Sequence, residues 1–482
     1  MSLDRRSVLK TTALATAAGP FAGLVAAPAS ARSAPDAAAL VPVPDRRDGV
    51  VRLHLPPGFK YRSFHHTLLP VTLTDGTSLP GRHDGMAAFD GPDDTVVLVR
   101  NHEINNPRPA FGPGEPYDPM AGAGTATIQV TKKGKPIRSF TSLNGTMMNC
   151  SGGPMPWGAW VTCEETVNGP DVGPDFTGRS NIPLEERHGY VFEVPAAAHP
   201  GAGQSSRTPI RHAGRFAHEA VSFDPVGGHL YLTEDNFAFP SGFYRYTPPN
   251  DAVADGRIDD GGTLHMLKVG GVTNAHLEGA QVEGTVYPVE WVEIAEPDVA
   301  YPYTPGQTAP TSNDTALTHV GRQGWEQGAA FFSRLEGQIY DDGMVWFTST
   351  QGGGAPETVA SEPITGYGNG FGQVWGYDPA TETLRVVFQS PDQLTMELPD
   401  NITTSPRGTL VVCEDGPADN FLRGLTTDGE LFDIALNAIE GRRGDEFAGS
   451  TFSPDGHTLF VNIQSDVGMT FAIWGPWETI GV

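Results

Sequence analysis

The segment Ala220-Val-Ser-Phe-Asp224, followed by Pro225-Val-Gly-Gly228 and then by His229-Leu-Tyr-Leu-Thr233, decides the fold. Its two flanks are short and rich in strand-forming residues, and the segment between them has the composition of a tight turn. This pattern predicts a β-hairpin. Related patterns lie at residues 85–89 with 95–99, around 157–161, at 337–340 with 344–348, at 402–405 with 409–412, and at 449–452 with 457–461.

Six similar hairpins in one chain indicate a β-propeller, in which short antiparallel sheets repeat around a central axis. Most copies are further apart than the ~40 to 45 residues of a WD repeat, so we expect larger blades with long loops. The 59 glycines and 42 prolines are spread between the alternating runs, which also favours many strands. A β-sandwich accommodates six like units poorly. We therefore predict an all-β, six-bladed β-propeller with long inter-strand insertions and little helix.

The predicted domain organisation is a single propeller domain over residues 32–482. A long segment between the third and fourth hairpins, residues 249–332, is rich in proline, glycine, aspartate and threonine. We interpret this segment as the outer strands of a blade together with an insertion that covers one face. Residues 323–334 are expected to form its one short helix.

Residues 1–31 have the features of a twin-arginine signal peptide. Asp4-Arg5-Arg6-Ser7-Val8-Leu9-Lys10 precedes an apolar, alanine-rich run, and Ala29-Ser30-Ala31 has the small residues of a cleavage site. The sequence therefore predicts recognition by the twin-arginine export machinery and a secreted or periplasmic product. This route exports folded proteins, which suggests a metal acquired in the cytoplasm. A rapidly folding protein without a cofactor is the alternative.

The composition excludes several kinds of partner. The chain has 57 acidic and 31 basic residues and a formal net charge of −26. This excess of negative charge repels nucleic acids and anionic membranes, and it favours cation binding. Beyond the leader no apolar stretch approaches the ~18 residues of a membrane span, so we expect no stable membrane insertion. The three cysteines, Cys150, Cys163 and Cys413, are too few for a disulfide framework. We expect the protein to be a monomer.

The residues that flank each hairpin carry the chemistry. In an antiparallel pair, the residue before the first strand and the residue after the second lie at the same end, about 5 Å apart. The flanking residues are Asp84 and Glu103, Cys150 with Glu164 and Glu165, Glu219 with Glu234 and Asp235, Glu336, Asp400 with Glu414 and Asp415, and Glu446. Inner strands that surround a channel would bring these carboxylates together at one mouth. The pattern leaves open whether the first or the second acid of each adjacent pair faces the metals.

Clustered carboxylates repel one another within ~4 to 6 Å, and burial adds a desolvation penalty. Bound cations remove this conflict, and carboxylate oxygens are the hard ligands that Ca²⁺ and Mg²⁺ prefer. Cys150 is the one soft donor of the set and suits iron or zinc. Any single acid could instead cap a neighbouring turn. Cys163 and Cys413 are expected to pack in the core, because strand alternation turns them away from the acids that follow.

Arg334 is the one strong cation that this reading places beside a hairpin. It is either a charge partner of the surrounding acids or a planar fork that binds phosphate or carboxylate near the metals. Several metal ions together with an arginine suit displacement at phosphorus, because the charge of the transition state lies on the phosphoryl oxygens.

A series of short motifs extends along nearly all of the chain behind the leader. It includes Asn149-Cys150-Ser-Gly-Gly153, Thr162-Cys-Glu-Glu165, Gly214-Arg-Phe-Ala-His-Glu219, Arg334-Leu-Glu-Gly337 and Cys413-Glu-Asp-Gly416. In this order the motifs resemble those of the PhoX-type alkaline phosphatases.

The resemblance implies an exported phosphatase whose cofactor contains iron and calcium ions bridged by an oxo group. By this resemblance, Cys150 is similar to an iron ligand. The residues similar to the metal-binding carboxylates are Glu164, Glu165, Glu219, Glu234, Glu336, Glu414 and Glu446. Arg334 resembles the ligand of the substrate phosphate, with Asn149 as a helper.

Three functions follow as hypotheses. The first is a metal-dependent hydrolase of small phosphate monoesters that works at alkaline pH. The second is a calcium-dependent propeller lactonase or organophosphatase, which needs no thiolate and therefore predicts calcium without iron. The third is a non-catalytic propeller that binds a ligand or partner and uses calcium for stability alone.

Overall fold

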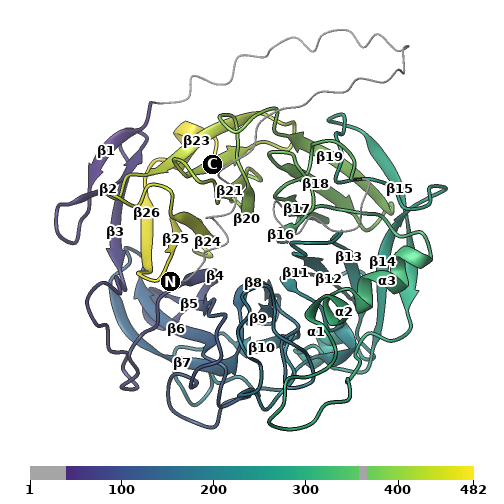
Figure 1. The fold of residues 1–482 in the computed structure, drawn as a ribbon. Coiled ribbons are helices and arrows are strands. Elements are labelled where there is room, and N and C mark those ends of the chain that lie inside the picture. Colours follow the sequence, from purple (N-terminus) through teal and green to yellow (C-terminus); the bar gives the residue numbers. More distant parts are fainter. Residues whose placement is uncertain (1–38, 358–365) are drawn as a thin grey trace, which may run out of the picture.

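The computed structural model describes residues 39–357 and 366–482, and these form a propeller-like, all-β arrangement of antiparallel sheets around a central axis (Figure 1). The predicted leader, residues 1–31, lies outside the described residues. No helix among the described residues has both the length and the apolar character needed to cross a membrane.

The first two sheets follow one another along the chain. One has the order β4 (His83–Asp90), β5 (Thr95–His102), β6 (Ala123–Thr131) and β7 (Pro136–Thr146). The next has the order β8 (Asn149–Met155), β9 (Ala159–Glu164) and β10 (Val191–Pro195). In each of these sheets the first two strands form a hairpin, and these are the first and second hairpins predicted from the sequence, which are thereby confirmed.

The third and fourth predicted hairpins belong to a single nine-stranded sheet. One half contains β11 (His218–Asp224), β12 (His229–Glu234), β13 (Phe243–Thr247) and β14 (Thr263–Val269), and the other contains β16 (Leu335–Asp341), β17 (Met344–Ser349), β18 (Gln373–Asp378) and β19 (Thr383–Gln389). Strand β15 (Val286–Ile294) pairs with β14 along most of its length and with β19 through its first three residues. The described residues therefore form five hydrogen-bonded sheets rather than six separate ones, because β15 joins two neighbours at their outer edges.

The N-terminal strands complete the last two sheets. Strands β1 (Val41–Pro44) and β2 (Val51–Leu55) extend the sheet of β20 (Pro399–Thr404), β21 (Leu410–Glu414), β22 (Phe421–Leu425) and β23 (Leu431–Asn437). Strand β3 (Lys60–Phe64) pairs with β26 (Met469–Trp474), which follows β24 (Glu446–Phe452) and β25 (Thr458–Gln464). The two ends of the described chain are thus joined through shared sheets, which closes the circle.

Helices are few and short in the part of the chain that the structure describes. They are α1 (Ala252–Asp255), α2 (Asn313–Leu317) and α3 (His319–Glu326), with 3₁₀ turns η2 (Pro92–Asp94), η3 (Arg211–Ala213) and η4 (Trp477–Ile480). The prediction of one helix at residues 323–334 is wrong in number and bounds. Helix α3 starts four residues earlier and ends at Glu326, because Gly328 has a φ of 90° and Phe331 and Phe332 form bridges to His276 and Ser241.

Six inner strands surround the axis. They are the first strands of the six predicted hairpins, and each contacts the next in the cycle β4, β8, β11, β16, β20, β24 and back to β4. The core lies between neighbouring sheets: Val161 and Val191 pack in one cluster with Val221 and Leu232, and all four are fully buried. Each such side chain contributes about 1.5 to 3 kcal/mol when it leaves water. This packing holds the inner strands in place around the axis.

Candidate metal centre

A β-bulge interrupts the hairpin pairing near the start of every inner strand. In five hairpins, two residues of the inner strand face one residue of its partner, and the first of the two is Asp84, Cys150, Glu219, Glu336 or Asp400. In the sixth hairpin the bulge comes at residues 449–450, three residues after Glu446. A bulge turns a side chain away from the regular alternation of the strand. The repeated bulge therefore turns five equivalent side chains toward the axis.

Glycine allows neighbouring bulges to pack backbone against backbone. A Cβ on Gly85 would lie 2.6 Å from the Cα atom of Ser151, and a Cβ on Gly337 would lie 2.6 Å from the Cα atom of Asn401. Both distances are shorter than a carbon contact allows, so a larger residue would push adjacent inner strands apart. Close packing of the bulges makes the ring narrow enough for side chains of different blades to meet.

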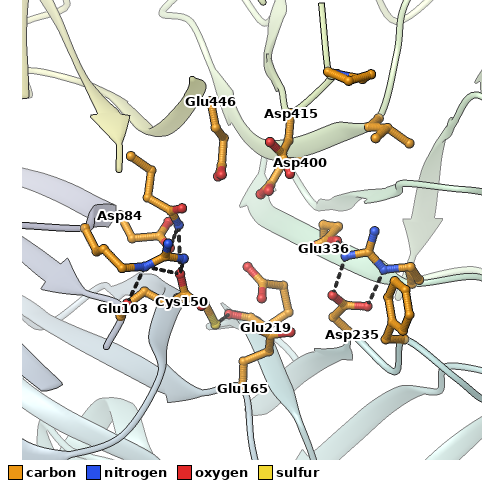
Figure 2. A pocket seen from close by; sticks show the side chains of 16 residues that line it. Asp84, Glu103, Cys150, Glu165, Glu219, Asp235, Glu336, Asp400, Asp415 and Glu446 are labelled. Atoms are coloured by element: carbon orange, nitrogen blue, oxygen red, sulfur yellow. Dashed lines mark hydrogen bonds and ion pairs between the residues drawn. The ribbon is translucent and has the colours of Figure 1, made fainter. Parts of the chain in front are cut away.

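The turned side chains line one pocket at the centre of the ring (Figure 2). The space within and above the pocket, open solvent included, is about 800 Å³. Its charged lining comprises Asp84, Glu103, Glu165, Glu219, Asp235, Glu336, Asp400, Asp415 and Glu446, together with Arg82 and Arg334. Cys150 is the one sulfur donor among the described residues that line it.

Three groups of side chains in this pocket have the spacing of metal ligands. Cys150, Glu165 and Glu219 offer ligand atoms within 4.8 Å of one another. Figure 2 shows these three side chains close together in the pocket. The second group is Glu219, Glu336 and Asp400, and the third is Asp400, Asp415 and Glu446. Because Glu219 and Asp400 each belong to two groups, the three positions are contiguous. The first position offers sulfur and oxygen, and the other two offer oxygen alone.

The electrostatics of the pocket favour bound cations. Burial, followed by the charges of neighbouring carboxylates, raises the pKa of Asp84, Glu219, Glu336 and Asp400 well above the ordinary range. Without cations these carboxyl groups would have to take up protons, whereas cations would let them stay ionised together. Burial, with Glu219 next, also raises the pKa of the Cys150 thiol, so its thiolate needs a positive neighbour. The donor set therefore fits a cluster of metal ions.

Arg334 is fixed in the pocket by two acids. Its Nε and Nη2 atoms donate to the two carboxylate oxygens of Asp235 at 3.0 and 2.7 Å, and Nη2 also donates to Glu336 at 3.0 Å. Burial alone would lower the pKa of Arg334, but the charges of Asp235 and Glu336 outweigh it and raise this pKa above its usual value. The guanidinium thus remains a cation and is oriented before any substrate arrives.

The structure brings six of the ten predicted site residues into the pocket and leaves four outside. Those in the pocket are Cys150, Glu165, Glu219, Glu336, Glu446 and Arg334, and those outside are Asn149, Glu164, Glu234 and Glu414. Asn149 is fully buried, and its side chain is hydrogen-bonded to the hydroxyls of Thr146 at 2.5 Å and Thr162 at 2.9 Å. It therefore holds the start of its hairpin together and does not reach the pocket.

The three acids outside the pocket share one arrangement, in which each accepts backbone N–H groups of the following segment. Glu164 accepts from Gly189 at 2.9 Å, Glu234 from Gly242 at 2.9 Å, and Glu414 from Phe421 at 3.0 Å. Each is the last residue of its strand, and the acid that comes next lines the pocket instead: Glu165, Asp235 or Asp415. The second acid of each pair is thus the one that faces the centre.

Five further acids that flank the hairpins line the pocket, as expected from their positions, although the resemblance assigned none of them to metal binding: Asp84, Glu103, Asp235, Asp400 and Asp415. Arg82 was missed altogether. Because Arg82 directly precedes β4 and lines the pocket, the prediction that Arg334 is the one cation beside a hairpin is wrong.

The chain matches a known protein family along most of its length. The family model for Alkaline phosphatase PhoX matches residues 38–139 and 115–466, which together cover most of the sequence. The chain belongs to the PhoX alkaline phosphatase family. This membership confirms the resemblance that the motifs indicated. The chain is therefore a phosphoric monoester hydrolase of the alkaline phosphatase type.

A solved structure shares the fold of this PhoX family member. The structure of Pseudomonas fluorescens PhoX in complex with vanadate, a transition state analogue, is 18% identical, with a TM-score of 0.64 over 92% of this chain and 98% of that chain. More remote is a gluconolactonase from Xanthomonas campestris, 12% identical, with a TM-score of 0.38 over 92% of this chain and 99% of that one. A virginiamycin B lyase from Staphylococcus aureus is also 12% identical, with a TM-score of 0.39 over 86% and 99%. No curated protein sequence matches the chain.

Proposed function

We propose that this PhoX family member hydrolyses phosphate monoesters at a centre of iron and calcium ions in the mouth of a six-bladed propeller. The cycle of six inner strands supports the blade count, with β15 as an outer connection between two blades. The observation that carries the proposal is the chain of three overlapping ligand groups from Cys150 to Glu446. These groups lie beside the oriented guanidinium of Arg334 in the same pocket.

The chemistry of the donors suggests which ion each group holds. Cys150, Glu165 and Glu219 combine a thiolate with carboxylates, which suits iron. The two groups without sulfur suit calcium, a hard cation that prefers oxygen ligands. Bound cations would supply the positive charge that a transferring phosphoryl group needs. We assign metal binding to the pocket-facing acids Glu165 and Asp415 in place of Glu164 and Glu414.

Arg334 performs the part of the reaction that the chain itself supplies. Its bonds to Asp235 and Glu336 use Nε and Nη2, and no residue within 39–357 or 366–482 is bonded to Nη1, which can therefore donate hydrogen bonds to phosphoryl oxygens. Because the guanidinium is held in place, little side-chain entropy is lost when the phosphate binds. The vanadate complex of Pseudomonas fluorescens PhoX supports this reaction class, since vanadate is described there as a transition state analogue.

Export by the twin-arginine machinery remains a prediction that rests on residues 1–31. It accords with the metal proposal, because a buried multinuclear centre is best assembled before or during folding. Small phosphate esters outside the cytoplasm would then be the substrates.

The decisive experiment combines elemental analysis with activity measurements on the purified, exported protein. We expect iron and calcium to copurify, and p-nitrophenyl phosphate to be hydrolysed at alkaline pH until a chelator removes calcium. Restoring calcium should restore the rate. Calcium without iron would contradict the assignment of Cys150. Hydrolysis that persists after complete removal of metal would contradict the proposal as a whole.

A further inference from the structure

The pocket contains a second arginine, Arg82, whose placement repeats that of Arg334. Arg82 begins the sequence Arg82-His-Asp-Gly85, and Arg334 begins the sequence Arg334-Leu-Glu-Gly337. Each directly precedes an inner strand and stands two residues before the acid at the bulge. Both have a left-handed backbone, with φ values of 49° and 40°. Met148 and Leu398, which directly precede β8 and β20, have the same conformation. Because it is uncommon for residues other than glycine, it marks a local structure that these four hairpins share.

The two arginines belong to opposite walls of the pocket. In the cycle of inner strands, β4 and β16 are separated by two strands in either direction. Figure 2 shows the same relationship among the labelled acids: Asp84 and Glu103, beside Arg82, lie across the pocket from Asp235 and Glu336, beside Arg334. A ligand in the pocket therefore has a guanidinium group on each side.

Arg82 is oriented by the same type of contacts as Arg334. Its Nε atom donates to the backbone oxygen of Glu103 at 2.7 Å and to the Glu103 carboxylate at 3.1 Å, and Nη2 donates to that carboxylate as well. Gln464 fixes the acids in turn, since its amide donates to Asp84 at 2.6 Å and to Glu103 at 3.1 Å. As with Arg334, no described residue is bonded to Nη1.

The two guanidinium groups differ in exposure. The side chain of Arg82 is 29% exposed, whereas that of Arg334 is 14% exposed. Burial opposes the charge of Arg82, but Glu103 and other nearby acids outweigh burial and keep its pKa above the usual value. Arg82 is therefore a permanent cation that a ligand can reach from the mouth of the pocket.

We propose that Arg82 binds a second oxyanion of the substrate, on the leaving-group side of the phosphate ester. The inference rests on the proposed function, in which Arg334 and the metal centre bind the phosphoryl group that is transferred. The substrate class is then phosphate monoesters that also carry a carboxylate or a second phosphate. An arginine fork matches either oxyanion through charge-assisted hydrogen bonds.

Matched substrates test this proposal on the metal-loaded protein. Glycerol 3-phosphate and 3-phosphoglycerate differ in that a hydroxymethyl group is replaced by a carboxylate. Fructose 6-phosphate and fructose 1,6-bisphosphate form a second pair, in which the added oxyanion is a phosphate. In each pair, we expect Arg82→Gln to lower kcat/KM for the substrate with the added carboxylate or second phosphate about 10- to 100-fold more than for the substrate without it, mainly through KM. A loss confined to one pair identifies which oxyanion is bound.

Two further variants distinguish a direct contact between Arg82 and the substrate from a general effect of positive charge near the pocket. Arg82→Lys should recover part of the selectivity, because it keeps the charge but loses the planar fork. Arg108→Gln removes a nearby positive charge that interacts with Arg82 but does not line the pocket, and it should leave the selectivity unchanged.

The outcomes distinguish this inference from the proposed function. Equal losses for both members of each pair, with metal content retained, would mean that Arg82 acts only by positioning Glu103, and they would overturn the inference. Unchanged ratios in Arg82→Gln would overturn it too. If the wild-type protein hydrolyses neither these esters nor p-nitrophenyl phosphate, the proposed function itself fails.

Discussion

Glu164 and Glu165 are consecutive residues whose carboxylates lie in different surroundings. Glu164 is fully buried and accepts a hydrogen bond from Nδ1 of His188 at 2.6 Å, whereas Glu165 faces Cys150 and Glu219 in the pocket. Strand β9 ends at Glu164, so one residue of chain separates a structural acid from a candidate metal ligand. Glu234 with Asp235 and Glu414 with Asp415 likewise consist of a buried acid outside the pocket and an acid that lines it, although Asp235 binds Arg334 and belongs to no ligand group.

Glutamine substitutions at these two positions should have opposite consequences. Glu164→Gln removes the charge beside His188, and we expect it to lower the free energy of unfolding by about 1 to 3 kcal/mol while metal is retained. Glu165→Gln should lose metal and activity but destabilise the metal-free protein less, because it relieves repulsion among clustered carboxylates. Denaturant unfolding of metal-free proteins and elemental analysis measure both effects. Metal loss in Glu164→Gln alone would reverse the assignment.

Arg334→Ala should lower kcat/KM for p-nitrophenyl phosphate by about 10²- to 10³-fold, since a charged donor to the phosphoryl group is lost. Metal content should change little. Arg443→Ala is the matched control, because Arg443 pairs with Asp419 on the surface and contributes little to stability. Near-normal activity in Arg334→Ala would show that its role is confined to neutralising Asp235 and Glu336.

Cys150→Ala should abolish activity and remove iron, because the other donors of its group are oxygens. Cys163→Ala provides the control: Cys163 is fully buried in the same hydrophobic cluster but does not line the pocket. Cys163→Ala should cost stability through a small cavity and keep iron. Iron and activity retained in full by Cys150→Ala would exclude a thiolate ligand.

His188 should make the fold sensitive to high pH. It is fully buried between Glu164 and Asp118, and although burial opposes its charge, these acids raise its pKa to about 9. A folded-state pKa above the unfolded value of about 6.5 gives a stabilisation that is complete below ~6.5 and is lost as the pH rises through about 9. The expected loss is about 3 kcal/mol.

Unfolding experiments at pH 7 and pH 10 test this dependence. His188→Gln should be less stable than the wild type at pH 7 and should show a smaller further decline at pH 10. His212→Gln is the control, because His212 pairs with Asp260 at the exposed surface. A pH dependence that is the same in the wild type and His188→Gln would exclude this ion pair as its source.

The hairpins could be predicted because their signals are local. Alternating residues around a proline- and glycine-containing turn specify two paired strands, and all six predicted hairpins are present in the structure. The connection through β15 could not be predicted in this way. Its pairing with β19 joins residues about a hundred positions apart and depends on how two blades meet at their outer edges.

The sequence also restricted the candidate site to the ends of the hairpins without choosing among the acids there. Strand alternation offers two adjacent acids equally, and the choice depends on where each strand ends. The backbone N–H groups of the next segment bind Glu164, Glu234 and Glu414, and only folding brings these groups close.

By itself, then, the sequence determined the fold class, the family and the places where acids and one thiol would gather, because strand periodicity and short motifs are written in neighbouring residues. The tertiary structure alone decided that the second acid of each pair faces the pocket and that Arg82 lies across from Arg334. The physical reason is that bulge geometry and the closure of the ring arise from packing between blades, where contacts join residues distant in the chain.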